Sequence, residues 1–334
     1  MRVLVTGGAG YVGSTTVETL YEAGHDVVVL DDLSTGHREA VIEGVKLEVG
    51  SYGDAETLAG ILERYKIEAV LHCAAKSQVG ESVADPAKYY RENVGGGVVL
   101  LEGMRLAGVR RIVFSSTAAV YGMPERTPIT EEMAPAPISP YGETKRTFEQ
   151  GIRWYGNAYG LRSVIFRYFN VAGATRRNGE AHSPETHLIP NVLAAADSGT
   201  EMTIFGDDFP TPDGTCIRDY IHVLDLARAH LLALEATDPS DARTGPEGGP
   251  CVPVVCNLGN SSGFSNRQVV ATAERVTGRT IRTGVGPRRA GDPAVLIASS
   301  ARAGEILGWH AQHDSLEEMI GSAWEWRRSR QQAS

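Results

Sequence analysis

The chain has 334 residues, of which 42% are apolar and 22% charged, and its formal net charge is −9. These proportions are those of a folded globular protein, and the length suggests two domains. The negative charge argues against a nucleic-acid or membrane-surface binder, and no apolar run reaches the ~20 residues of a bilayer span. The first residues, MRVLVTGG, already resemble a buried strand and leave no room for a leader. We therefore expect a cytoplasmic protein with a small-molecule partner and neither a nucleic-acid nor a membrane partner.

Short apolar runs alternate with segments of helical spacing through the first half of the chain. The expected strands are RVLVTGG, DVVVLDD, AVLHCAA, RIVFSST and RSVIFRYFN, and the expected helices begin near Tyr11, Asp54, Pro86 and Pro140. Strands that are continuously apolar suit a parallel sheet covered on both faces. The order of elements predicts a doubly wound α/β domain of the Rossmann type.

The pattern loosens beyond Asn170 into shorter strands and loops rich in glycine and proline. We expect an NAD-binding domain over residues 1–170 and a smaller α/β substrate domain over 171–334. Segments around 219–236 and 251–259 are candidates for a return to the first domain. The four cysteines have no zinc or redox spacing, so we expect reduced thiols and no metal site.

A glycine-rich stretch, TGGAGYVG, follows the first expected strand and precedes the first expected helix. Gly7, Gly10 and Gly13 form a GxxGxxG variant of the dinucleotide-binding turn, where a pyrophosphate would meet backbone amides. Asp31 and Asp32 end the second strand at the spacing expected for an acid on the adenosine ribose, and Asp31 is the preferred ligand. A carboxylate there would repel a 2′-phosphate, so NAD is favoured over NADP, although Arg38 lies near in the sequence.

The stretch ISPYGETK places Tyr141 and Lys145 four residues apart, on one face of a helix that Ser139 would cap. A nearby ammonium stabilises a phenolate, so Tyr141 is a candidate base. The strand RIVFSST ends in hydroxyl side chains at the edge where open α/β sheets bind ligands. Thr117 is the candidate for holding a substrate alcohol there, while Ser115 suits a strand-end cap.

The motifs TGGAGYVG, SSTAAVYG, SPYGETK, RYFN, GTCIRDYIHVLDLA and PRRAGDP together resemble the extended short-chain dehydrogenase/reductase family. The resemblance covers nearly the whole chain, and within the family it is to the enzymes that epimerise UDP-hexoses at C4. It implies Tyr141 as base, Lys145 as its modulator, and Thr117 as the active-site hydroxyl. It also implies a homodimer.

The resemblance further implies two sets of binding residues. The NAD contacts are Gly7, Gly10, Tyr11, Val12, Gly13, Asp31, Asp32, Ser51, Tyr52, Cys73, Ala74, Ala75, Lys76, Asn93, Ser115, Tyr141, Lys145 and Tyr168. The UDP-hexose contacts are Thr117, Tyr168, Asn170, His187, Leu188, Thr203, Phe205, Arg218, Arg289, Asp292 and Leu296, with both arginines on the diphosphate and Phe205 against uracil.

Four positions depart from the family pattern. Ser51 and Tyr52 stand where many relatives carry Asp-Ile for the adenine. Lys76 is displaced by one residue from the lysine of some members, which leaves its role open, and His187 replaces an asparagine of some relatives.

The implied reaction moves hydride from the sugar C4 to tightly bound NAD and returns it to the opposite face of a 4-keto intermediate. The alternatives are a nucleotide-sugar 4,6-dehydratase or decarboxylase on the same scaffold, or a non-enzymatic NAD-sensing protein. Dehydratases typically carry Asp-Glu directly after the active-site threonine, and decarboxylases usually carry Glu there, whereas this chain has Ala118 and Ala119.

Leu296 bears on the range of sugars. The resemblance places it on the far wall of the sugar pocket, where a bulky tyrosine goes with the unsubstituted hexoses and a smaller residue leaves room for a 2-acetamido group. UDP-GlcNAc and UDP-GalNAc are therefore candidate substrates too. The alternative is that Leu296 belongs only to the core.

Overall fold

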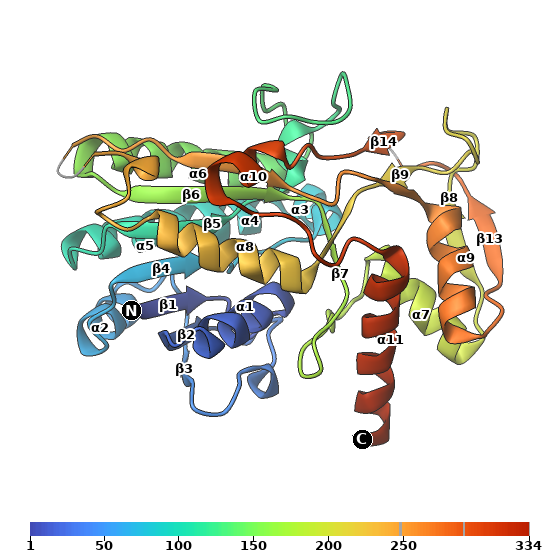
Figure 1. Cartoon of the computed structure of the whole chain (residues 1–334), viewed down its shortest axis with the longest axis horizontal. Helices are drawn as coiled ribbons and strands as arrows, with labels where there is room; N and C mark the ends of the chain where they lie inside the picture. The colour runs from blue at the N-terminus through green and yellow to red at the C-terminus, as the bar shows by residue number, and fades with distance from the viewer. Residues whose placement is uncertain (247–248, 290, 334) are drawn as a thin grey trace.

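The structure, a computed structural model, describes residues 1–246, 249–289 and 291–333. A seven-stranded parallel sheet lies at its centre, in the order β11-β6-β5-β4-β1-β2-β3 (Figure 1). Its strands are β1 (Arg2–Thr6), β2 (Asp26–Asp31), β3 (Lys46–Val49), β4 (Ala69–His72), β5 (Arg111–Ser115), β6 (Arg162–Tyr168) and β11 (Val254–Leu258).

Helices cover both faces of this sheet. The helices α1 (Tyr11–Glu22) and α8 (Val223–Ala236) pack on one face, and α2 (Ala55–Arg64), α5 (Gly96–Leu106) and α6 (Pro140–Tyr159) pack on the other. Successive side chains of β1 enter opposite cores, since Val3 and Val5 meet the first layer and Leu4 the second. Burial on both faces explains the continuous apolar strands and confirms the predicted doubly wound α/β fold.

Two segments from the second half of the chain complete this sheet and its cover. The strand β11 pairs with β6, with Val254 beside Val164, and α8 lies against α1. The short helix α10 (Ala301–Leu307) packs on β11 and α8. The segments around 219–236 and 251–259 were candidates for a return to the first domain, whereas the sequence did not indicate α10.

The rest of the second half forms a smaller lobe, at the right of Figure 1. Its helices α7, α9 and α11 enclose a separate core that includes Val192, Val269 and Ile320. The bounds are β7 (Asn170–Ala172), α7 (Leu188–Ser198), β8 (Met202–Phe205), β9 (Ile217–Arg218), β10 (Tyr220–His222), β12 (Phe264–Ser265), α9 (Asn266–Thr277), β13 (Thr283–Gly286), β14 (Val295–Leu296) and α11 (Leu316–Ala333).

The helix expected from Pro86 is present but interrupted. It runs as α4 (Pro86–Tyr89), a π-helical segment (Tyr90–Gly95) and α5, and the shorter α3 (Val79–Ala84) precedes it. The extra residue of a π turn is often found near functional sites. Three 3₁₀ turns complete the described elements, at Arg38–Ala40, Ala118–Tyr121 and Ala242–Thr244.

A buried ion pair fixes α6 on the sheet. Arg167 on β6 donates through Nη2 to Glu149 Oε2 on α6 at 2.6 Å, and their side chains are 7% and 5% exposed. Glu149 Oε1 also accepts from the Ser116 hydroxyl at 2.5 Å, and Arg167 Nη1 donates to Tyr121 Oη at 3.0 Å. The pair therefore connects α6 to the segment that follows β5.

No helix in the described part of the chain combines the length and the apolar character that crossing a membrane requires.

We predict that Glu149→Gln lowers the free energy of unfolding by about 3 kcal/mol or more, because it leaves a buried guanidinium without a compensating charge. Glu317 makes an ion pair of the same 2.6 Å length with Arg275, but those side chains are 57% and 60% exposed. Glu317→Gln should therefore cost less than about 1 kcal/mol. Denaturant unfolding of both variants measures the difference, and equal losses would contradict the role given to burial.

Candidate functional site

A cavity of about 1770 Å³ lies along the carboxyl ends of β1, β2, β4, β5 and β6 and extends to the smaller lobe. Ligands of open parallel sheets bind at this edge. All the site residues predicted from the sequence line the cavity except Asn93 and Ser115. The cavity is therefore the candidate active site.

The glycine-rich turn leaves no space for side chains. Gly7 has a φ of +74°, and a Cβ there would lie 2.6 Å from Ala74 N. A Cβ on Gly13 would collide with the carbonyl oxygen of Gly7. The helix α1 begins directly after Gly10, and the free amides of a first helical turn bind phosphate groups. The turn therefore fits the pyrophosphate of a dinucleotide.

The two acids at the end of β2 have different surroundings. Asp31 is buried and accepts from the amides of Ala9 at 2.9 Å and Leu33 at 2.8 Å. Burial raises the pKa of Asp31 despite these bonds. Burial also favours a higher pKa for Asp32, but hydrogen bonds from Ser34 and the charge of Lys76 lower it overall. Each Asp31 oxygen keeps a second lone pair that a ribose hydroxyl could use.

Lys76, whose role the sequence left open, reaches back to the end of β2. Its Nζ lies 2.6 Å from Ser34 Oγ and 3.7 Å from Asp32 Oδ2. The lysine thus balances the charge of Asp32 beside the cavity.

Ser51 and Tyr52, which follow β3, line the cavity with their hydroxyl groups already engaged. Tyr52 donates to the Glu92 carbonyl at 2.9 Å, and Ser51 Oγ accepts from Gly53 N at 3.0 Å. The Tyr52 ring also meets His72 edge-on, with centroids 4.8 Å apart. A ligand here would contact the Tyr52 ring rather than its hydroxyl.

Local sequence places Tyr141 at the start of α6. Ser139 Oγ accepts from Gly142 N at 3.2 Å and Pro140 occupies the first turn, so the predicted cap is confirmed. Gly142 is needed because a Cβ there would lie 2.6 Å from the Ala119 carbonyl oxygen. This close approach brings Tyr141 beside Thr117, whose side chain influences the pKa of the tyrosine.

The environment of Tyr141 keeps it protonated near neutral pH. Burial raises its pKa to about 12, although the neighbouring Thr117 side chain favours a lower value. Burial lowers the pKa of Lys145 to about 8. Lys145 Nζ donates to the Ser115 carbonyl at 2.8 Å and lies 4.7 Å from the centre of the Phe114 ring.

Asn93 and Ser115 stand behind the cavity wall. Asn93, on the π-helical segment, accepts from Lys76 N at 2.9 Å and donates to Lys76 O at 3.0 Å. Ser115 Oγ lies 3.3 Å from Cys73 Sγ and 2.9 Å from His230 Nε2. Both residues therefore hold lining segments in place. Burial raises the pKa of the Cys73 thiol to about 11 and that of Tyr168 well above its ordinary value.

The smaller lobe contributes the cationic part of the cavity. Arg218 on β9 donates to Asp292 Oδ1 at 2.7 Å, and the Arg289 guanidinium lies 4.2 Å from the centre of the Phe205 ring. Arginine offers a fixed set of donors that matches phosphate oxygens.

The remaining predicted contacts also line this part of the cavity. Asn170 begins β7 and donates to the Asp219 carbonyl at 2.9 Å. The other residues are His187 and Leu188 at the start of α7, Thr203 on β8, and Leu296 on β14.

The sequence analysis missed Glu180 and His182, which line the cavity as well. Glu180 Oε1 lies 2.5 Å from His182 Nδ1. Burial alone would raise the pKa of Glu180, but this hydrogen bond lowers it overall. The alternation of acids and histidines in GEAHSPETH was the available signal.

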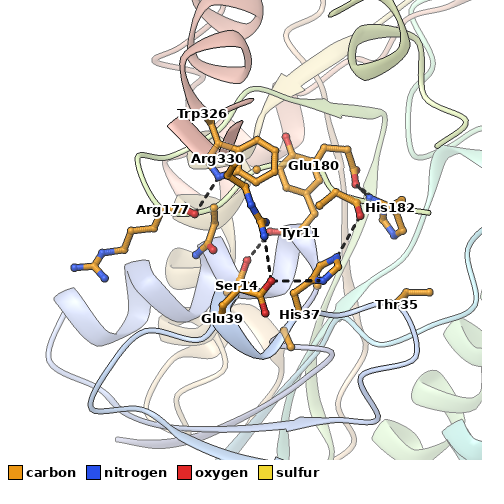
Figure 2. A pocket seen from close by; sticks show the side chains of 16 residues that line it. Tyr11, Ser14, Thr35, His37, Glu39, Arg177, Glu180, His182, Trp326 and Arg330 are labelled. Atoms are coloured by element: carbon orange, nitrogen blue, oxygen red, sulfur yellow. Dashed lines mark hydrogen bonds and ion pairs between the residues drawn. The ribbon is translucent and has the colours of Figure 1, made fainter. Parts of the chain in front are cut away.

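These two residues also border a second, smaller cavity of about 160 Å³, shown in Figure 2. Its other side is formed by α11, where Trp326 Nε1 donates to the Arg177 carbonyl at 3.0 Å and Arg330 pairs with Glu39 at 3.0 Å. Tyr11 lies between the two cavities and lines both.

The comparisons with known proteins agree with this geometry. The chain is 50% identical over 330 residues to the UDP-glucose 4-epimerase of Streptomyces lividans, covering 98% of this chain and 96% of that one. A crystal structure of UDP-glucose 4-epimerase from Brucella ovis in complex with NAD is 46% identical, with a TM-score of 0.91 and 97% of each chain covered. The enzyme from Bifidobacterium longum, in complex with NAD⁺ and UDP, is 33% identical, with a TM-score of 0.91 and 100% of each chain covered.

The family model described as the NAD dependent epimerase/dehydratase family matches residues 3–244, from β1 through α8, and ends before the last strand of the sheet, β11. The matched region contains the glycine-rich turn, Thr117, Tyr141, Lys145 and Arg218. Because this model covers more than half of the chain and a relative is 50% identical over 98% of it, the chain belongs to the NAD dependent epimerase/dehydratase family.

Proposed function

We propose that the chain interconverts UDP-glucose and UDP-galactose by epimerisation at C4, using bound NAD. The relatives at 46–50% identity over nearly the full length support this activity. The observation that carries it in this chain is that Thr117 and Tyr141 line one cavity side by side, between a dinucleotide turn and two arginines. This arrangement would allow a sugar hydroxyl to be oxidised next to NAD while the diphosphate at the other end of the substrate is held by the arginines.

The glycine-rich turn, Asp31 and the segment Cys73–Lys76 would hold NAD, with Lys145 near the nicotinamide end. When bound, NAD supplies a reversible hydride acceptor for the sugar C4. Asn93 and Ser115 act here as positioning residues, because they bind Lys76 and Cys73 behind the wall.

Tyr141 accepts the O4 proton as the alcohol becomes a ketone, and later returns it to O4. Thr117 holds O4 at hydrogen-bond distance. The pKa of Tyr141 is about 12 even with Lys145 buried on the same helix face, so the base form of the tyrosine needs further positive charge, which the oxidised nicotinamide ring would add. The protein thus keeps the tyrosine neutral until the site is filled.

Arg218 and Arg289 would bind the diphosphate, and the face of Phe205 not covered by Arg289 would stack on uracil. Anchoring the nucleotide leaves the 4-keto sugar free to turn between hydride departure and return. We propose that residues 1–170 form the NAD-binding part and residues 171–334 the UDP-hexose-binding part. A cytoplasmic location remains a prediction.

A 4,6-dehydratase or decarboxylase fits less well. Elimination of water needs an acid and a base after the active-site threonine, and here Ala118 and Ala119 line the cavity with methyl groups. A non-enzymatic NAD sensor would have no use for the Thr117–Tyr141 pair. A coupled assay with UDP-galactose separates all three, since only the epimerase yields UDP-glucose.

We also propose a homodimer through the outer face of α5 and α6. Val98, Leu106, Trp154 and Tyr159 are large apolar side chains exposed on this face, with Leu106 at 72% and Trp154 at 68%. The two helices pack side by side, so a second copy would cover a continuous apolar surface.

We expect Tyr141→Phe to reduce kcat by about 10²–10⁴-fold with little change in UDP affinity, because a general base contributes that much and does not hold the nucleotide. Thr117→Val should lose less, since the base remains. Tyr159→Phe, an exposed tyrosine of the same helix, is the matched control and should keep full activity. Steady-state kinetics with UDP binding measure both effects, and near-normal turnover of Tyr141→Phe would remove Tyr141 as the base.

Activity on N-acetylated sugars is the finer proposal. Leu296 lines the cavity and also packs on a small buried cluster that includes Val120 and Phe169. Leu296→Tyr should lower kcat/KM for UDP-GlcNAc by about tenfold or more relative to UDP-glucose, because it fills space that the acetamido group needs. Leu296→Met, of similar volume, is the control. Equal losses on both sugar pairs, or a wild type inactive on UDP-GlcNAc, would remove the proposal for N-acetylated sugars and leave the epimerase proposal intact.

Trp154→Glu should convert the dimer to a monomer, because it places a charge in the apolar contact. Val285→Glu, on β13 and 56% exposed, controls for a new surface charge elsewhere. Light scattering after size exclusion should give twice the 35.8 kDa chain mass for wild type and control. A monomeric wild type would contradict the dimer.

A further inference from the structure

A cluster of histidines and glutamates on the loop before α7 has no part in the proposed proton or hydride transfer. Glu180, His182 and His187 each offer a ligand atom, and these three atoms all lie within 4.8 Å of one another. All three residues line the large cavity, and Glu180 and His182 also line the small one. The loop therefore brings together nitrogen and oxygen donors between the two cavities. Figure 2 shows two of these side chains, Glu180 and His182, beside each other at the edge of the small cavity.

The carboxylates of this cluster face histidine rings. Glu180 lies 2.5 Å from His182 Nδ1 and 3.9 Å from His187 Nδ1, and Glu185 lies 2.7 Å from His187 Nδ1. In the described part of the chain, the ion pairs that Glu180 and Glu185 make run to these two rings. With neutral imidazoles the group carries two negative charges, one of them on the largely buried Glu180. A divalent cation would neutralise it.

The donor set indicates which cation. Two imidazoles and one carboxylate are the ligands of zinc in many proteins, at about 2.0–2.2 Å from the ion. Tetrahedral ligands at that distance are about 3.4 Å apart, so the widest separation here must close by roughly 1.4 Å. Side-chain rotation on an eight-residue loop segment, 180–187, can supply that movement.

The surroundings of His187 match those of a metal ligand. Glu185 pairs with His187 Nδ1 at 2.7 Å, and the same nitrogen lies 3.9 Å from Glu180. A rotation of the ring that turns Nε2 toward Glu180 would give the carboxylate–histidine arrangement found behind zinc ligands. The His187 side chain is half-exposed, which gives an ion access from the solvent.

We propose that Glu180, His182 and His187 bind one Zn²⁺ ion, with Glu185 as the outer partner of His187 and a water in the fourth position. The ion connects the loop to the first turn of α7 and fixes the part of the cavity wall beside Tyr11. This site does not include Thr117 or Tyr141, and its existence does not depend on the proposed function, although His187 is also one of the expected UDP-hexose contacts.

Another group of similar composition provides a control. His313 lies 2.5 Å from Glu318 and next to His222, with ring centroids 4.9 Å apart. Both His222 nitrogens are already engaged, Nδ1 with Leu224 N at 3.1 Å and Nε2 with Ser322 Oγ at 3.1 Å. The group at His313 therefore has a histidine–glutamate pair but lacks a third side chain with a free ligand atom, so it should not bind the ion.

The proposal is tested on the full chain after treatment with a chelator. Zn²⁺ is titrated in a calorimeter to measure affinity, and metal analysis gives the number of ions bound per chain. We expect one Zn²⁺ per chain, at least tenfold weaker binding in His182→Gln and in His187→Gln, and about tenfold weaker binding in Glu185→Gln. His313→Gln should bind as the wild type does. Thermal unfolding without metal checks that each variant is folded.

Co²⁺ in place of Zn²⁺ reports the coordination number of the bound ion, because the visible absorption of Co²⁺ intensifies as its coordination number falls below six. An intense band that is present in the wild type and lost in His187→Gln would support the site. Absence of Zn²⁺ uptake would overturn it, as would equal binding by wild type and the His182→Gln/His187→Gln double variant. The first result assigns the loop to hydrogen-bonded, protonated histidines, and the second places the ion elsewhere.

Discussion

The buried ion pair between Glu149 and Arg167 fixes the position on which the proposed chemistry depends. Glu149 lies two turns after Tyr141 on α6, and the same carboxylate accepts from Ser116, the neighbour of Thr117. One side chain thus sets the distance between the helix that carries the tyrosine and the strand end that carries the threonine. Gly142 allows that distance to be short, because the Ala119 carbonyl occupies the space of a side chain.

Electrostatics divides the cavity into parts with different tasks. At the end of β2, Lys76 offsets Asp32, and in the smaller lobe Arg218 and Arg289 provide positive charge within a chain whose net charge is −9. Between them, burial keeps Tyr141 neutral and weakens the hold of Lys145 on its proton. A tyrosine in this setting becomes a base only when ligands alter its surroundings, which ties proton transfer to a filled site.

Much of this arrangement could be predicted from the sequence because it is local. Continuous apolar strands indicated the parallel sheet, and Ser139 with Pro140 indicated the start of α6. Positions at the strand ends, such as Thr117 and Asp31, followed from the rule that ligands meet the carboxyl edge.

The rest depends on contacts between distant segments. The pairing of β11 with β6 joins Val254 to Val164, and nothing in either segment specifies the other. Asn93 and Ser115 were expected at the ligand, but the π turn and the inward side of β5 place them behind the wall. Glu180 and His182 could not be assigned to a site from the sequence, because the path of the loop brings them close to His187 and Tyr11.

The most direct test of the central claim follows the hydrogen at C4. UDP-glucose carrying deuterium at C4, incubated with the enzyme in ordinary water, should yield UDP-galactose that retains the label at C4, because the hydride returns to the carbon it left. NMR and mass spectrometry of the products measure its position. Deuterium found at C6 of a dehydrated sugar, or lost to solvent, would contradict epimerisation through a transient ketone in this cavity.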